Sequence, residues 1–80
     1  MSLARYFVFE NAHDWLVTLD GTRLGRHPDR AAAVTSAIVM ADLMGSMRHD
    51  ADVMVEQDGR LEIAWTYGVD AVPPAQEKAA

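Results

Sequence analysis

The sequence predicts an α+β domain, with a single helix packed on one face of a four-stranded antiparallel sheet in the order β-β-α-β-β. Four runs rich in β-branched and aromatic residues are separated by turn sequences, and one long helical stretch lies between the second and third runs. A chain of 80 residues can bury only one modest core. We therefore expect one domain over residues 1–70 and a disordered tail over residues 71–80, where two prolines disfavour helix and strand.

Residues 5–10 and 14–19 form the first predicted hairpin, because the residues between them have turn chemistry. Closing the chain over residues 11–14 sets three pairs opposite each other, namely Glu10 with Trp15, Val8 with Val17 and Tyr6 with Leu19. The other face of this hairpin then carries Phe7, Phe9, Leu16 and Thr18. Both faces are largely apolar, which is unusual for a sheet that is covered on one side only.

After a turn signal at Asp20 and Gly21, residues 22–26 could add a short and weak extra edge strand. The helix follows, with Asp29 as its N-cap and three alanines of high helix propensity close behind, and we expect it to run from Arg30 to about Met47. Its apolar arc spans about 200°, against the roughly 100° that a surface helix needs. Part of the helix surface therefore requires a cover other than the sheet.

Residues 51–56 and 60–67 form the second predicted hairpin. We prefer a three-residue loop at residues 57–59 to a two-residue loop of Asp58 and Gly59, because the longer loop sets the valines of one strand opposite Leu61 and Ile63. The expected core residues are Tyr6, Val8, Trp15, Val17, Leu19, Val34, Ala37, Ile38, Ala41, Val53, Val55, Leu61 and Ile63, with Trp65 at the end of the same face.

Several residues match one family pattern across residues 5–68: Tyr6, Val8, Trp15, Val17, Ala33, Val34, Ala37, Ala41, Val53, Val55, Asp58, Gly59, Arg60, Tyr67 and Gly68. In these positions the chain resembles a family of small bacterial domains, the domain-of-unknown-function family numbered 2188. The chain departs from the family by having Ala31, Ala32, Val39 and Met40 where charged helix residues are usual. The resemblance implies the ββαββ fold and transfers no catalytic residue, because the function of the family is unassigned.

Two apolar surfaces exceed what so small a domain can bury alone. The predicted interface residues are Phe7, Phe9 and Leu16 on the sheet and Met40, Leu43 and Met47 on the helix. A second copy of the chain across a two-fold axis is the simplest cover, and a standard interface needs about 800 Å² per partner. We therefore expect a non-enzymatic, homodimeric protein-interaction module, while another protein partner and methionines that merely fill the core stay open as alternatives.

Catalytic residues, cofactors and metal sites are not expected. The chain has no cysteine, and His13, His27 and His49 lie in predicted loops without a third partner at a defined spacing. An enzyme with a site shared across a dimer interface is the least favoured alternative.

Nucleic acid is the main alternative partner, because Phe7 and Phe9 beside Arg5, with Arg60 as a further candidate, could form a base-stacking platform. A net charge of -5 opposes phosphate binding, and we expect Glu56 and Glu62 on the same sheet face. No apolar run suits a membrane span or a secretion signal, and the lack of cysteine fits a reducing compartment. We expect a cytoplasmic protein, and the preference for Arg over Lys together with the many alanines indicates a bacterial origin.

Overall fold

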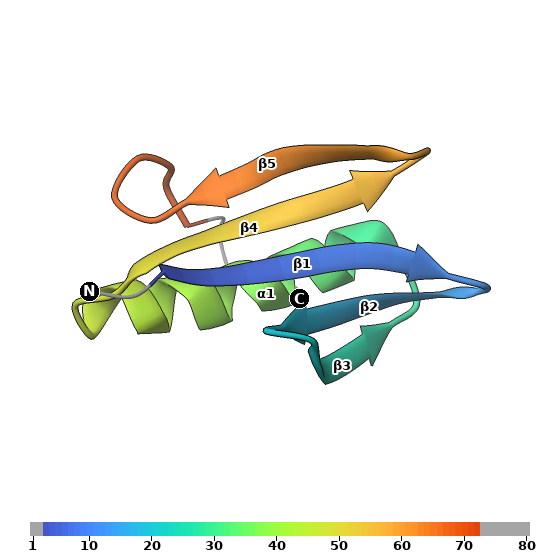
Figure 1. The fold of residues 1–80 in the computed structure, drawn as a ribbon, viewed down its shortest axis with the longest axis horizontal. Coiled ribbons are helices and arrows are strands. Elements are labelled where there is room, and N and C mark those ends of the chain that lie inside the picture. Colours follow the sequence, from blue (N-terminus) through green and yellow to red (C-terminus); the bar gives the residue numbers. More distant parts are fainter. Residues whose placement is uncertain (1–2, 73–80) are drawn as a thin grey trace, which may run out of the picture.

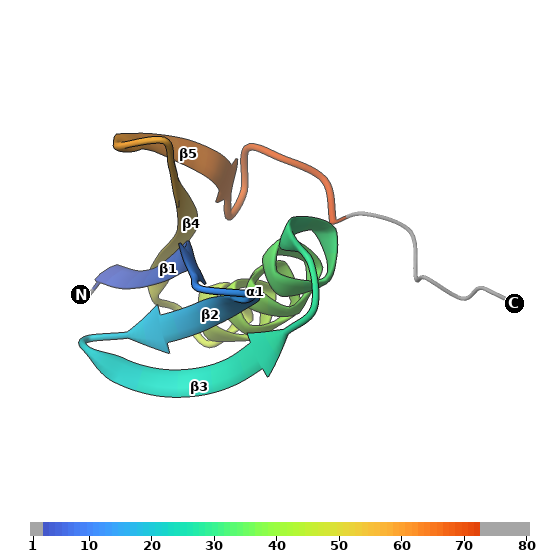
Figure 2. The same cartoon turned by 90° about the vertical axis from the view of Figure 1, so that its right-hand side faces the viewer.

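The computed structural model describes residues 3–72 and contains five strands and one helix (Figure 1). The elements are β1 (Leu3–Asn11), β2 (Asp14–Leu19), β3 (Thr22–His27), α1 (Arg30–Ser46), β4 (Asp50–Gln57) and β5 (Arg60–Thr66). The strands form one sheet in the order β3-β2-β1-β4-β5, and the helix lies on one side of it (Figure 2). The α+β class and the single helix agree with the sequence. Most of the predicted tail, residues 73–80, lies outside the described residues.

The predicted four-stranded antiparallel sheet is wrong, since the sheet has five strands and its two central strands, β1 and β4, pair in parallel. The cause is the number of strands before the helix. The segment expected to form at most a weak edge strand is a full strand, β3, which pairs antiparallel with β2 and therefore runs in the same direction as β1. The helix carries the chain back, so β4 starts at the same end as β1. Two strands before the helix would have made β4 antiparallel to β1.

The predicted register of the first hairpin is confirmed, because β1 and β2 pair as expected at all three positions. The turn is tighter than its sequence indicates. Asn11 and Asp14 pair with each other, so only Ala12 and His13 lie between the strands. Ala12 accommodates this turn with a φ of 58°.

The predicted register of the second hairpin is wrong. Gln57 pairs with Arg60, which leaves a two-residue loop of Asp58 and Gly59. Both loop residues have positive φ angles, 56° and 75°. This is the backbone of a type I′ turn, whose twist matches that of the strands it joins, and Asp-Gly is among its preferred sequences. The turn preference therefore outweighs the side-chain match on which the longer loop was predicted.

Leu61 and Ile63 leave the predicted core as a direct consequence of the shorter loop. They pair with Glu56 and Met54, which point away from the helix. Leu61 is 52% exposed and Ile63 is 60% exposed. A shift of one residue moves every side chain of a strand to the other face, and here it moves two large apolar residues out of the core.

A bulge in the β4–β5 pairing returns Trp65 to the core. The register shifts between Val53 and Met54, so Ala64 is the extra residue and Trp65 pairs with Val53 on the helix side. Trp65 is only 3% exposed, and its indole N–H donates a hydrogen bond to the backbone oxygen of Ala71 at 3.0 Å. The two-residue turn moves Leu61 and Ile63 away from the helix, and the bulge thus returns the rest of β5 to the predicted facing.

The core lies between the helix and the sheet, and the other predicted core positions are confirmed as buried or packed against it. The buried cluster consists of Ala4, Tyr6, Val8, Trp15, Val17, Ala33, Ala37, Ile38, Ala41, Ala51, Val53, Val55 and Trp65. Leu19 and Val34 are partly buried against this cluster. Asp29 caps the helix as predicted, since its Oδ1 accepts a hydrogen bond from the backbone N–H of Ala32 at 2.8 Å.

The segment after β5 packs on the last turn of the helix through Tyr67. The backbone N–H of Tyr67 donates to the carbonyl oxygen of Ala51 at 2.9 Å, which anchors the residue to the start of β4. Its ring lies edge-on to that of Trp65, with centroids 6.2 Å apart. A Cβ at position 45 would overlap the Tyr67 ring, so Gly45 is needed for this contact.

Gly45→Ala should therefore destabilise the domain by about 1 to 3 kcal/mol, the usual cost of overpacking. On helix propensity alone the same change would stabilise by about 1 kcal/mol. Urea unfolding of the two chains measures the difference. The double variant Gly45→Ala/Tyr67→Ala is the control, because without the ring the added methyl should stabilise relative to Tyr67→Ala. An increase in stability for Gly45→Ala alone would contradict the packing described here.

Candidate functional site

Among the elements of residues 3–72, none lies over the side of the sheet opposite the helix (Figure 2). Paired residues point to the same side, so two rows of side chains cross this side of the sheet. One row is Leu16, Phe9, Glu56 and Leu61, and the other is Thr18, Phe7, Met54 and Ile63. We call the six apolar members, Phe7, Phe9, Leu16, Met54, Leu61 and Ile63, the open face.

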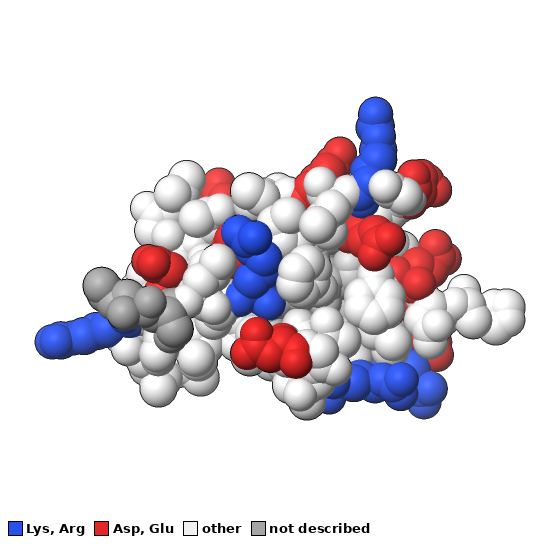
Figure 3. Space-filling view, viewed as in Figure 1, with Lys and Arg blue, Asp and Glu red and all other residues white. Residues whose placement is uncertain are grey.

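The open face is a continuous surface. Leu16 and Met54 are only 4% and 9% exposed although no helix covers them, so neighbouring side chains on the same face must shield them. Phe7 and Phe9 are half-buried. In the space-filling view, uncharged surface lies beside one basic group near the middle of this side, and most other charged groups lie towards its margins (Figure 3).

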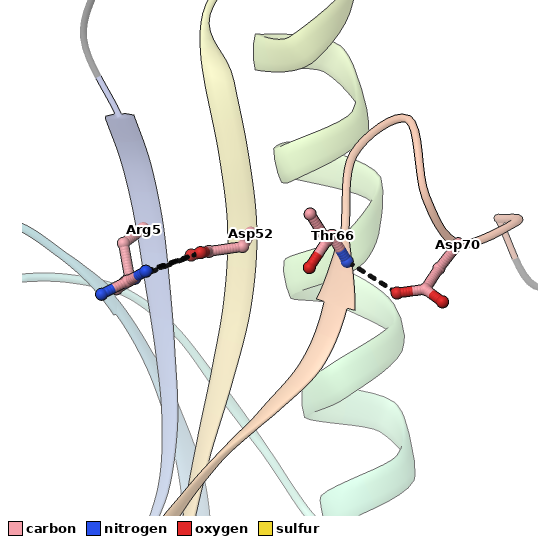
Figure 4. A network of polar contacts seen from close by, with 4 residues as sticks. All are labelled: Arg5, Asp52, Thr66 and Asp70. Carbon is pink, nitrogen blue, oxygen red and sulfur yellow. Dashed lines mark hydrogen bonds and ion pairs between the residues drawn. The ribbon is translucent and has the colours of Figure 1, made fainter.

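One ion pair, between Arg5 and Asp52, joins β1 and β4 (Figure 4) and lies in the row of side chains next to Phe7 and Met54. The two residues are paired across β1 and β4. Arg5 Nε donates to Asp52 Oδ1 at 2.9 Å, and Arg5 Nη2 donates to Asp52 Oδ2 at 2.8 Å. The hydrogen bonds and charge of Asp52 raise the pKa of Arg5 above its ordinary value. The two side chains therefore satisfy each other's hydrogen bonds, although Asp52 is buried.

The two margins of the open face carry opposite charge. On the β3 side, Arg23 pairs with Thr18 and Arg26 pairs with Leu16, so both arginines point to the same side as the open face. On the β4–β5 side, Glu56 belongs to the open side and borders a shallow hollow that Glu10 and Asp58 also line. Arg26 lies 3.5 Å from Asp14 through a side chain that is 67% exposed.

The predicted interface residues of the helix lie on the other side of the molecule. Met40 is partly buried against the core, whereas Leu43 and Met47 are 60% and 56% exposed. With Val39, which is 57% exposed, these two residues form a single row along the outer surface of the helix. The six predicted residues thus separate into two surfaces. Sequence reasoning missed Met54, Leu61 and Ile63; the signal for Leu61 and Ile63 was the Asp58–Gly59 turn, and that for Met54 was its alternation with the core residues Val53 and Val55.

The three histidines do not assemble into a metal site. His13 lies in the β1–β2 turn, His27 ends β3 and His49 precedes β4. Across residues 3–72, no three His, Asp or Glu side chains are placed to hold a metal ion. Within the same range, no helix has the length and hydrophobicity to cross a bilayer.

No family model matches the chain, and no curated protein or solved structure matches it either. The resemblance to the family numbered 2188 therefore stays a prediction. Any conclusion about function depends on the geometry of this chain.

Asp52→Asn should destabilise the domain by about 1 to 2 kcal/mol, because it removes charged hydrogen bonds and leaves Arg5 without a counter-charge. Asp14→Asn is the matched control, since the longer and more exposed pair with Arg26 should contribute less than about 0.5 kcal/mol. Urea unfolding at one fixed chain concentration gives both values. Equal effects of the two substitutions would contradict the assignment of the Arg5–Asp52 pair as the stronger one.

Proposed function

We propose that this domain is a non-enzymatic protein-interaction module that forms a homodimer through its open face. The observation that carries the proposal is the uncovered apolar surface at the centre of the sheet. Isolated exposed apolar residues are ordinary on any protein, but here the exposed Leu61 and Ile63 adjoin the half-buried Phe7 and Phe9 in one apolar group, which is typical of a contact surface. A second copy presents the same surface and can cover it symmetrically.

The size of the open side is sufficient for a stable dimer. The domain is a slab with extents of 35 × 32 × 20 Å, and the open side is one of its broad sides (Figures 1 and 2). A standard interface takes about 800 Å² from each partner, which a side of this size can supply. The added burial would also support a domain whose own core is small.

The open face is better suited to dimerisation than the row of apolar residues on the helix. Val39, Leu43 and Met47 form a single line, whereas the open face spans four strands. The Arg5–Asp52 pair is already complete within one chain, so covering it leaves no unpaired charge behind.

The same surface supports nucleic-acid binding less well than it supports dimerisation. Arg5, the basic residue closest to the phenylalanines, is held by Asp52, and Glu56 lies in the row of Phe9. Glu62 does not lie on this side as predicted, because it pairs with Val55 on the helix side, and Arg60 likewise pairs with Gln57. The net charge of -5 adds a general repulsion from phosphate.

Ile63→Asp should shift the mass measured by light scattering from twice 8.8 kDa towards 8.8 kDa, because it places a charge in the proposed contact. Leu43→Asp is the matched control on the helix, since both side chains are 60% exposed and neither change should unfold the domain. The control should keep the mass of the unaltered chain.

A single-chain mass for the unaltered protein at micromolar concentration would refute the homodimer. Loss of the dimer in Leu43→Asp alone would assign the contact to the helix. Labelled single-stranded DNA or RNA should show no binding at 50 mM salt, and binding that weakens with added salt would favour the nucleic-acid alternative.

A further inference from the structure

We infer that the two copies are related by a two-fold axis running nearly along β1, which brings the basic β3 margin of each copy over the acidic β4–β5 margin of the other. The inference rests on the proposed homodimer and defines its partner surface. The specific contact is between Arg26 of one copy and Glu56 of the second copy, formed twice.

Sheet packing leaves only two directions for the axis. In the aligned class of face-to-face packing, which we take for these two sheets, the strands lie within about 30° of each other. A two-fold axis in the plane of the interface rotates the strands of one copy, relative to those of the other, by twice the angle between the axis and the strands. The axis must therefore run nearly along the strands or nearly across them. Because β1 is the middle strand of five, either axis can pass over it and bury the whole open face.

A two-fold axis along the strands places each row of side chains over the same row of the partner. It places β3 of each copy over β5 of the other. Phe9 then lies over the partner's Phe9, and Arg26 lies over the partner's Leu61, next to the partner's Glu56. Packed sheets are about 10 Å apart, a gap that an arginine and a glutamate reaching from opposite sides can span.

Both charged side chains are available for this contact. Glu56 is exposed and forms no ion pair with any residue between 3 and 72. Arg26 has its contact with Asp14 at 3.5 Å, and its side chain is 67% exposed, so it can turn towards the partner. The hollow beside Glu56, which Glu10 and Asp58 also line, adds negative charge where the guanidinium would arrive.

An axis across the strands gives an unfavourable set of contacts. It places β3 over the partner's β3 and exchanges the two rows of side chains, so that Arg26 lies over the partner's Arg23 and Glu56 over the partner's Met54. Like charges then meet at Arg26 and Arg23. Both axes place Glu56 over an apolar side chain, which is Met54 here and Leu16 for the axis along the strands, so the contacts of Arg26 distinguish the two axes. The charge distribution of the open side therefore selects the axis along β1.

The test exchanges the two charges and measures the dimer dissociation constant by sedimentation at low salt. Arg26→Glu and Glu56→Arg should each weaken the dimer on the order of tenfold, because two attractive contacts become repulsive. The double variant Arg26→Glu/Glu56→Arg should regain most of the affinity. An equimolar mixture of the two single variants should form a heterodimer of nearly unaltered affinity, since both of its contacts join opposite charges. Arg60→Glu, on the helix side of the same hairpin, is the control and should change little.

The outcomes separate this inference from the homodimer itself. A tighter dimer for Arg26→Glu would favour the axis across the strands and overturn the inference, as would a mixture of the single variants that binds no better than either variant alone. Unchanged affinity in both single variants would overturn it as well, although Ile63→Asp could still break the dimer. A monomeric unaltered chain would instead refute the proposed function.

Discussion

The central strand β1 is apolar on both of its sides, and the single helix of 17 residues can bury only one of them. Tyr6 and Val8 point to the helix, whereas Phe7 and Phe9 point away from it. Its parallel neighbour β4 is buried over five consecutive residues from Ala51 to Val55, and on the side away from the helix it combines the apolar Met54 with Asp52 and Glu56. Paired parallel strands normally have cover on both sides. Across residues 3–72 this domain supplies a helix on one side only, and we propose that a second copy covers the other.

The Arg5–Asp52 pair explains how a polar contact can persist in such a surface. It joins the two parallel strands through their side chains on the side without a helix. A lone arginine or aspartate in this position would resist covering, because burying a single charge costs several kcal/mol. As a closed pair with two short hydrogen bonds, it stabilises the strand pairing and still allows the surface to be covered.

Local signals in the sequence predicted the elements well, and the errors came from features that act over longer distances. The N-cap at Asp29, the register of the first hairpin and the helix boundaries each depend on a few neighbouring residues. The direction of β4 depends instead on whether residues 22–27 form a strand, and that segment contains glycine and two arginines in place of the usual β-branched run. Pairing with β2 makes it a strand, which no local pattern could establish. The open face shows the same limit, because half of its apolar residues belong to β4 and β5.

The turn at Asp58 and Gly59 sets the register of the second hairpin, which was wrongly predicted, and with it the extent of the open face. Strand side chains alternate, so one residue more or less in the loop decides whether Leu61 and Ile63 face the helix or the open side. With the longer loop, both would join the core, and the open face would lose its two most exposed members. The type I′ turn places them outside, and the bulge at Ala64 then returns Trp65 to the core that they leave. The backbone preference of a two-residue turn thus sets the extent of the surface through which we propose that the domain associates.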